Sequence, residues 1–280
     1  MNGNHRIAKY WDEIQATTLD YEPRVQELHA FFSKYGVKKV LDAACGTGTL
    51  LLYLSRLGYE CTGLDADHHM LAKAREKAEK ENAPIQFLQG DMKHIKLDMK
   101  LEQKFHAVTC FQAFSFLASD KDVEQTLAGI KHTLVPGGLF IFEILGRDMD
   151  TGPAGPAIPD IPDTPIIPTT PDTPTIHATS LPPFIDIARE TTDVKIVRIN
   201  QLAMGAHSLE WQAIYFFNEN NNENNGMTME IAQVPLRVYT PGEIEKLVEA
   251  SGFHIKASVS RDGGGIKQKN LMLYCGLNAE

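Results

Sequence analysis

The feature that most constrains the fold of this chain is a regular alternation of two patterns between residues 37 and 145. Short runs of aliphatic or β-branched residues are separated by segments in which apolar residues recur at helical spacing. This alternation is typical of βαβ units, which build a mostly parallel sheet with helices on its faces. The expected strands are VKKVLD (37–42), ECTGLD (60–65), IQFLQG (85–90), HAVTCF (106–111) and GLFIFEIL (138–145).

Helices are expected between these strands. One begins after Asp67 and carries a run of charged residues, Lys73 to Lys80, which predicts a face exposed to solvent. Another covers 122–134 and ends before a Pro-Gly pair that suits a tight turn into the next strand. Together, the strands and helices predict an α/β protein with a doubly wound core.

Longer strand patterns follow in the second half of the chain. The segments ETTDVKIVRINQL, SLEWQAIYFFN and GMTMEIAQVPLRVY predict an antiparallel meander within residues 186–240. Thr240, Pro241 and Gly252 then suit the cap, the first turn and the stop of a helix. Two last strands, FHIKASVS and NLMLYCGL, are expected to close the sheet.

A proline repeat separates the two halves. Between Pro153 and Pro174 a proline stands at every third residue, which is the period of a polyproline II helix. We expect a stiffened surface loop within residues 146–185; the alternative is a docking segment for a partner that recognises proline-rich ligands. A second low-complexity segment, NENNNENN at 218–225, has nothing to bury and predicts a flexible tip.

Charge and cysteine usage argue against some classes of function. The formal net charge is −9, whereas nucleic-acid binding draws on clustered Lys and Arg, so no nucleic-acid partner is expected. The four cysteines form no C-x-x-C pair and have no histidine at ligand spacing, so neither a metal site nor a disulfide framework is indicated. The chain also lacks an apolar run of membrane-span length and a signal-peptide pattern. The expected compartment is the cytoplasm.

The segment KVLDAACGTGTL, at 39–50, looks at first like a dinucleotide-binding turn. Gly46 and Gly48 match the fingerprint G-x-G-x-x-G/A, but Leu51 stands at the third position. Asp42, at the end of the first strand, would repel a pyrophosphate by roughly 4 kcal/mol at about 4 Å, which outweighs backbone hydrogen bonds of about 1 kcal/mol each. The site is therefore predicted to take a nucleoside that has positive charge and no phosphate. S-adenosylmethionine satisfies both demands.

Two further acids follow later strands. Asp65 ends the second strand, 19 residues after Gly46, which is the spacing of the acid that binds ribose hydroxyls in nucleotide-binding βαβ units. Asp91 follows the third strand, where a carboxylate can accept a hydrogen bond from the adenine amino group. The alternative is that Asp65 and Asp91 only cap the helices after them. Acids at three successive strand ends favour the nucleoside site.

On these residues the chain resembles the class I S-adenosylmethionine-dependent methyltransferases. The resemblance is carried by VLDAACGTGTLLLYLSRLGYECTGLDADHHMLAKAREKA, FLQGDM and LVPGGLFIFEIL within 40–145, and by RVYTPGEIEKLVEASGF at 237–253. The N-terminal YWDEIQATTLDYEPRVQEL is similar to the lid helices of members that act on small molecules. The layout is closest to that of glycine N-methyltransferase and the deoxyaminosugar N-methyltransferases.

The resemblance implies a Rossmann-like, doubly wound, mostly parallel seven-stranded sheet with an N-terminal helical lid and an antiparallel β insertion. The implied divisions are a lid at 1–36, a cofactor-binding core at 37–145, the proline-rich loop at 146–185, the β insertion over the active site at 186–240, and a C-terminal helix with the last two strands at 241–280.

The resemblance also implies a set of residues that bind S-adenosylmethionine. These are Asp42, Ala44, Gly46, Thr47 and Gly48 for the methionine part, Asp65 for the ribose, Ala66, Met70, Asp91 and Met92 for the adenine, Cys110 and Phe111 for the sulfonium, and Tyr10 and Tyr21 from the lid for the carboxylate or methyl region. His106 is a departure, because the family usually begins its fourth strand with Asp. That position tends to lie away from the ligand.

The acceptor side is less constrained. Aromatic residues suit an apolar or cationic acceptor, while core packing is the alternative, favoured for Phe116. The residues expected to line the pocket are Gln112, Phe114, Trp211, Tyr239 and Tyr10. A neutral amine needs no general base, whereas a hydroxyl would need one, and the candidates for such a catalytic group are Tyr10 and His207. A solvent-facing His207 is the alternative.

Several functions stay open at this point. We favour methyl transfer to the nitrogen of a small-molecule amine, because a lid and a roof would enclose a pocket. The alternatives are O- or S-methylation of a small molecule, a protein methyltransferase that docks through the proline repeat, and a non-catalytic scaffold that retains the fold.

Overall fold

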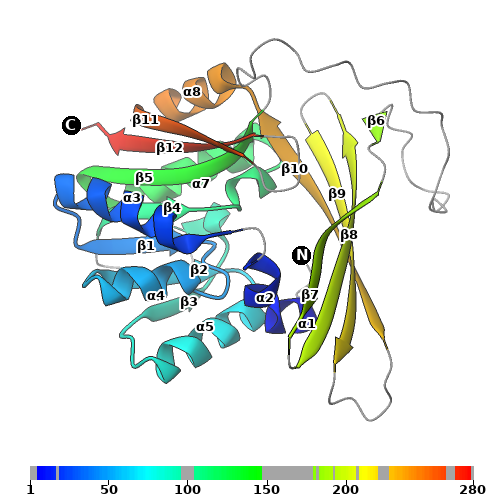
Figure 1. Cartoon of the computed structure of the whole chain (residues 1–280). Helices are drawn as coiled ribbons and strands as arrows, with labels where there is room; N and C mark the ends of the chain where they lie inside the picture. The colour runs from blue at the N-terminus through cyan, green and yellow to red at the C-terminus, as the bar shows by residue number, and fades with distance from the viewer. Residues whose placement is uncertain are drawn as a thin grey trace.

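The structure is a computed structural model that describes residues 5–16, 19–95, 104–146, 179–180, 183–191, 193–205, 208–219, 227–262 and 269–278. Two sheets lie side by side, with short N-terminal helices between them (Figure 1). The proline repeat, most of the asparagine-rich segment and His207 lie outside the described residues.

The helices mostly agree with the sequence pattern. They are α1 (His5–Lys9), α2 (Trp11–Gln15), α3 (Tyr21–Lys34), α4 (Thr49–Arg56), α5 (His68–Lys80), η1 (Met92–His94), η2 (Phe114–Phe116), α7 (Asp120–Thr133) and α8 (Pro241–Ala250). Helix α8 begins with the expected cap: the Thr240 hydroxyl accepts from the Glu243 N–H, and the Glu243 carboxylate accepts from the Thr240 N–H. This reciprocal pair fixes where the helix starts.

The strands fall into a core set and an inserted set. They are β1 (Lys39–Ala43), β2 (Glu60–Asp65), β3 (Gln86–Gln89), β4 (Phe105–Cys110), β5 (Leu134–Gly146), β6 (Thr179–Ser180), β7 (Phe184–Glu190), β8 (Val194–Met204), β9 (Ser208–Glu219), β10 (Thr228–Tyr239), β11 (Phe253–Asp262) and β12 (Lys269–Leu277).

The core sheet confirms the predicted fold class. Within the described residues its strand order is β3-β2-β1-β4-β5-β12-β11, with β1 to β5 parallel and the last two strands antiparallel. One apolar cluster packs α7 and α8 against one face, and another packs α3, α4 and α5 against the other. Because β1, β2 and β4 run parallel, their carboxyl ends meet at one edge of the sheet.

The inserted sheet consists of β6 to β10 and differs from the expectation at its start. We expected one strand from Glu190 through Leu202, but the chain forms β7, turns, and pairs β7 antiparallel with β8. The turn is closed by Thr191, whose backbone N–H donates to the Val194 carbonyl at 2.9 Å and whose hydroxyl accepts from the Val194 N–H. Thr191 therefore forms a turn within a segment that was expected to be a single strand.

Helices α1 and α2 lie between the two sheets (Figure 1). Ile7, Tyr10 and Ile14 pack with apolar residues of β7, β8 and β9, so one face of the inserted sheet is buried against the lid. Strand β10 reaches the core sheet, where Val238 pairs with Leu145 of β5. None of the helices that the structure describes is long and apolar enough to span a membrane.

Candidate cofactor site

The turn between β1 and α4 adopts backbone conformations that favour small residues. Ala44, Gly46 and Gly48 all have positive φ, at 68°, 54° and 73°. A Cβ on Gly48 would lie 3.0 Å from the Phe87 ring, whereas a Cβ on Gly46 would meet only Trp11 Nε1, at 3.8 Å. Gly48 is therefore needed for packing, and Gly46 leaves room in front of the turn for a ligand to approach the backbone.

Asp65 faces this turn from the end of β2. Its carboxylate accepts a hydrogen bond from the Gly46 N–H at 2.7 Å and another from the Asp67 N–H at 2.9 Å. Burial is the main cause that raises the pKa of Asp65 above its ordinary value, and these backbone donors oppose the rise. Asp65 thus organises the loop and places a half-buried carboxylate beside it.

Asp42 is a buried acid at the end of β1, with 4% of its surface exposed. The Thr109 hydroxyl donates to its Oδ1 at 2.7 Å. The pKa of Asp42 is raised to about 7, mainly by burial and in smaller part by the charge of Asp65, while the Thr109 hydrogen bond and Arg24 oppose the rise. Asp65, whose charge raises the proton affinity of Asp42, and Asp42 itself thus form a place at the sheet edge where a cation would be stabilised and a phosphate repelled.

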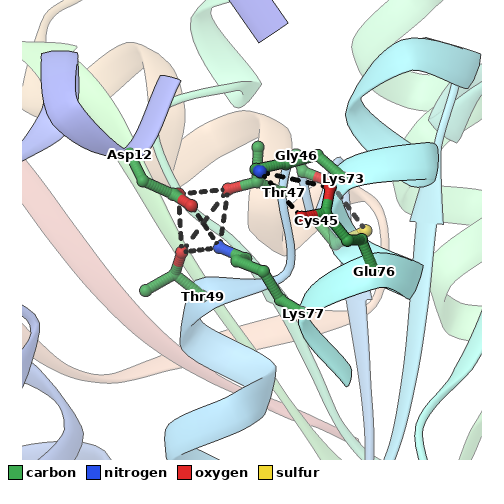
Figure 2. A network of polar contacts seen from close by, with 8 residues as sticks. All are labelled: Asp12, Cys45, Gly46, Thr47, Thr49, Lys73, Glu76 and Lys77. Carbon is green, nitrogen blue, oxygen red and sulfur yellow. Dashed lines mark hydrogen bonds and ion pairs between the residues drawn. The ribbon is translucent and has the colours of Figure 1, made fainter. Parts of the chain in front are cut away.

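A polar cluster joins the lid to the turn (Figure 2). Asp12 of α2 accepts from the hydroxyls of Thr47 at 2.6 Å and Thr49 at 3.0 Å, and its other oxygen lies 2.6 Å from Lys77 Nζ. Lys77 also donates to Thr49 at 2.7 Å. We predicted that Lys77 faces solvent, and this was wrong: α2 covers that part of α5 and shelters the ammonium.

An open cavity of about 640 Å³ lies next to this cluster. Its lining residues are Asp12, Gln15, Ala16, Leu19, Asp20, Tyr21, Thr49 and Tyr53. Tyr21 opens α3 and stacks on Tyr53, with ring centroids 6.2 Å apart. Burial and the nearby charge of Asp42 raise the pKa of the Tyr21 hydroxyl, which therefore stays protonated and can donate a hydrogen bond. Lid and core both contribute to this cavity.

The residues expected around the adenine follow β2 and β3, and Cys110, expected near the sulfonium, ends β4. Asp91 accepts from the Lys93 N–H at 2.9 Å and so caps η1, as the alternative interpretation held, but its carboxylate also lies 3.5 Å from Lys93 Nζ. The Cys110 thiol lies 3.9 Å from the Met92 sulfur. Ala66 is exposed and Met70 is half-buried on the first turn of α5. Asp91 and Met92 are likewise partly exposed, whereas Cys110 is fully buried.

A buried ion pair lies beside Phe111. Arg24 of α3 donates to both Glu143 oxygens, at 3.1 and 3.3 Å, and its guanidinium lies 4.8 Å from the centroid of the Phe111 ring. The sequence analysis missed Arg24 and Glu143, although a signal exists, since Arg24 stands on the apolar stripe of α3 that includes Leu28. Next to Phe111, the Gln112 side chain accepts from Gln15 of α2 at 2.6 Å.

The expected acceptor pocket is not assembled as we described it. Phe114 and Tyr239 are fully buried, and the Phe114 ring packs 4.5 Å from that of Phe142 and 6.2 Å from that of Tyr239. The short helix η2 turns Phe114 inward, so neither side chain has a surface to offer an acceptor. The partly buried Phe116 packs against the same core, as favoured.

Two other candidates belong to the inserted sheet. The Tyr10 hydroxyl donates to Glu219 at 2.6 Å, and its ring stacks on Phe217. The indole of Trp211 donates to Asn200 at 2.9 Å. His106 lies at the start of β4, where it accepts from the Lys39 N–H at 3.2 Å, far along the strand from the glycine turn.

Comparison with known proteins agrees with this geometry. The sequence family described as a methyltransferase domain matches residues 40–138. A protein of Geobacillus sp. (strain WCH70), named as an assumed methyltransferase, is 33% identical over 141 residues, which are 49% of this chain and 56% of that protein. A glycine/sarcosine N-methyltransferase of Aphanothece halophytica is 30% identical over 138 residues, covering 48% of this chain and 50% of that enzyme. The chain thus spans about half the length of the curated relatives it matches.

A sugar-modifying relative and two solved structures extend the similarity. The dTDP-3-amino-3,6-dideoxy-alpha-D-glucopyranose N,N-dimethyltransferase of Streptomyces fradiae is 30% identical over 49% of this chain and 52% of its own. A S-adenosylmethionine-dependent methyltransferase from Clostridium acetobutylicum superposes with a TM-score of 0.71 at 16% identity, over 98% of both chains. CalS10, an amino pentose methyltransferase from Micromonospora echinaspora, gives a TM-score of 0.64 at 17% identity over 95% of both. Residues 40–138 therefore match the methyltransferase-domain family, and the chain has the fold of the S-adenosylmethionine-dependent methyltransferases.

Proposed function

We propose that this chain transfers a methyl group from S-adenosylmethionine to the nitrogen of a small-molecule amine. The observation that carries the proposal is the pair of acids, buried Asp42 and half-buried Asp65, beside a glycine turn with an open approach at Gly46. Because the charge of Asp65 helps to raise the pKa of Asp42, a ligand with an ammonium group would be stabilised there.

The residues present fit this cofactor. Asp42 would hold the ammonium, and the backbone at Gly46 and Gly48 would accept the amino-acid part. Asp65 would keep its bond to the Gly46 N–H and offer its remaining lone pairs to ribose hydroxyls. The Tyr21 hydroxyl, protonated by virtue of burial, would donate to an anionic oxygen of the ligand. Met92 and Met70 would contact the adenine.

The catalytic contribution of the protein would be positional. When bound, S-adenosylmethionine supplies an electrophilic methyl group on a sulfonium. Helix α2, held to the turn through Asp12, would close the site and exclude water, and the strand ends would hold donor and acceptor in line. Such alignment alone can lower the barrier by about 7–11 kcal/mol. A neutral amine acceptor has its own lone pair, so the protein needs only to leave a path for the released proton.

An amine acceptor is supported by the names of the relatives. Glycine/sarcosine N-methyltransferases and an amino sugar N,N-dimethyltransferase share the domain, and an amino pentose methyltransferase shares the fold. The Gln15–Gln112 pair lies next to Phe111 and would offer neutral polar groups to a hydrogen-bonding acceptor. Neutral amides bind hydroxyls and amines without requiring a charged partner.

A product assay tests the proposal. The purified full chain is incubated with S-adenosylmethionine and a panel of small amines, hydroxyl compounds and thiols, and S-adenosylhomocysteine formation is measured. We expect turnover with at least one amine, and a loss of turnover in Asp65→Ala. Asp193→Asn, in the exposed turn between β7 and β8, is the matched control and should keep full activity. Turnover confined to hydroxyls or thiols, or no turnover of any compound in the panel, would contradict the amine assignment.

A further inference from the structure

Arg24 and Glu143 form an ion pair in a part of the molecule that is otherwise mostly apolar. Arg24 stands on the buried face of α3, and Glu143 stands in β5 between the buried residues Phe142 and Ile144. Only 5% of Arg24 and 3% of Glu143 are exposed. A buried ion pair adds little net stability, since the cost of removing two charges from water offsets their attraction. Stability alone therefore does not account for this pair.

The pair has a fixed place beside the end of β4. The Nη1 and Nη2 groups of Arg24 donate to the two Glu143 oxygens at 3.1 and 3.3 Å, and Asn270 of β12 donates to Glu143 Oε1 at 3.1 Å. The guanidinium of Arg24 lies 4.8 Å from the centroid of the Phe111 ring. Phe111 directly follows β4, so both charges are held next to the residues at that strand end.

The end of β4 is also where the cofactor's sulfonium is proposed to lie. Cys110 is the last residue of β4, and strand pairing places it opposite Phe142, the residue before Glu143. S-adenosylmethionine carries a positive charge on its sulfur, whereas S-adenosylhomocysteine has a neutral thioether at the same place. A fixed charge near this point therefore acts strongly on the first ligand and hardly on the second.

The charge of Glu143 reaches the end of β4. Burial is the main cause that raises the pKa of the Cys110 thiol well above its ordinary value, and three carboxylates add to the rise. These are Asp42, Asp65 and Glu143. The charge of Arg24 acts in the opposite sense, because it opposes the rise in the pKa of Asp42. Glu143 is therefore a third acid acting on this site, and Arg24 is the cation that offsets it.

We propose that the Arg24–Glu143 pair sets the charge balance at the sulfonium position and thereby determines the preference of this protein for the methyl donor over its demethylated product. This inference rests on the proposed function. Glu143 would stabilise the sulfonium, and Arg24 would limit that stabilisation. The limit matters because positive charge moves from sulfur to the acceptor nitrogen during methyl transfer. A strongly negative site would hold the donor more tightly than the transition state and slow the reaction.

Calorimetric titration of the full chain with S-adenosylmethionine and, separately, with S-adenosylhomocysteine tests the inference. The measured quantity is the ratio of the two dissociation constants. Glu143→Gln leaves the Arg24 charge uncompensated, so the preference for S-adenosylmethionine should fall about tenfold. Arg24→Gln leaves the Glu143 charge uncompensated, so the same preference should rise about tenfold.

The ratio separates an effect of charge from a loss of structure. Both ligands share the adenosine and amino-acid parts, so looser packing or a changed ionisation of Asp42 would affect both dissociation constants and cancel in their ratio. A purely structural role of the pair would therefore weaken both ligands in both variants. Only an effect of charge at the sulfur shifts the ratio in opposite directions.

Arg56 and Glu81 provide the matched control. They form a second Arg–Glu pair, in which the Nε and Nη2 groups of Arg56 donate to Glu81 Oε2 at 3.1 and 2.6 Å. The two side chains are 54% and 33% exposed, and Arg56 ends α4, at the opposite end of that helix from the glycine turn. Because water and salt screen this pair, Arg56→Gln and Glu81→Gln should leave the ratio unchanged.

Circular dichroism shows whether each variant is folded. Opposite shifts of the ratio in Glu143→Gln and Arg24→Gln support the inference, whereas shifts in the same direction, or no shift, overturn it. If either variant fails to fold, Asn270→Lys places a cation beside Glu143 at a half-buried position and should lower the preference for S-adenosylmethionine. An unchanged preference in that variant would overturn the inference.

The same titration distinguishes this inference from the proposed function. A wild type that binds neither ligand would overturn both. A wild type that binds both ligands, with a ratio that the variants leave unchanged, would overturn this inference alone.

Discussion

The carboxylate of Asp12, on the lid helix α2, lies 2.6 Å from the ammonium of Lys77 on the core helix α5. The same carboxylate accepts from Thr47 in the glycine turn, so one residue ties the lid to the core and to the proposed cofactor site. Both partners of the ion pair are partly sheltered, which strengthens it relative to a surface pair.

Replacing Asp12 should loosen the lid. Asp12→Ala removes the acceptor for Thr47, Thr49 and Lys77, and we expect roughly tenfold weaker binding of S-adenosylhomocysteine, equivalent to about 1.4 kcal/mol. Calorimetry measures the affinity, and limited proteolysis of the N-terminal helices should accelerate. Glu22→Ala, on the exposed first turn of α3, should change neither. An unchanged affinity in Asp12→Ala would show that the lid contact does not serve the ligand.

Gly48 should be intolerant of any side chain. Gly48→Ala combines a positive φ with a Cβ at 3.0 Å from Phe87, and we expect a loss of about 1–3 kcal/mol in the free energy of unfolding. Gly58→Ala is the control for backbone strain alone, because Gly58 also has positive φ, 87°, but no atom within 4 Å of the added Cβ. Urea unfolding should show a clearly larger loss for Gly48→Ala than for Gly58→Ala. Equal losses would mean that packing against Phe87 is unimportant.

Replacing only one partner of the buried ion pair Arg24–Glu143 should lower the free energy of unfolding. Arg24→Met leaves Glu143 buried with Asn270 as its remaining described donor, and we expect a loss of about 3–5 kcal/mol. In the double variant Arg24→Met/Glu143→Leu most of that loss should be recovered, since no uncompensated charge remains. A double-mutant cycle by chemical denaturation measures the coupling. Additive losses would show that the two side chains act independently.

Asp42 should make the ligand-free protein less stable as pH rises. Its pKa is about 7 when folded, against an ordinary 3.8, so between about pH 4 and pH 7 the folded state holds a proton that the unfolded state has released. The folded state binds more protons, and stability therefore falls across that window and levels off above it. Asp42→Asn keeps an acceptor for Thr109 and removes the ionisation.

The Asp42→Asn variant should accordingly be the more stable protein at pH 8. The gain has an upper limit of about 4 kcal/mol, because one pKa unit corresponds to about 1.4 kcal/mol, and it should vanish near pH 4. Urea unfolding at both pH values measures it. A variant that is less stable than the wild type at pH 8 would contradict the account of Asp42 as a destabilised acid kept for binding.

The sequence predicted the core sheet well because its signals are local. Aliphatic runs, the Thr240 cap and the glycine turn each specify their own backbone, and the βαβ rule then orders the strands. Strand β7 was missed because Thr191 gives only a weak turn signal. The Lys77 contact was missed because it depends on α2, which is distant in the sequence.

The cofactor side of the site could be predicted from the sequence, whereas the proposed acceptor side could not. Asp42, Asp65 and the glycines follow from the strand ends, where position in the sequence fixes position in space. The proposed acceptor side needs side-chain directions, and an aromatic residue after a strand can point either way: Phe114 turned into the core, whereas Phe111 packs beneath Arg24. Pattern alone does not distinguish these outcomes.

The most direct test of the central claim is titration calorimetry of the full chain with S-adenosylhomocysteine and, separately, with NADH at pH 8. We expect S-adenosylhomocysteine to bind and NADH not to bind. The variant Asp42→Asn should bind S-adenosylhomocysteine more weakly and should still not bind NADH. Tight binding of NADH by the wild type, or undiminished binding of S-adenosylhomocysteine by Asp42→Asn, would contradict the role assigned to the buried acid at the end of β1.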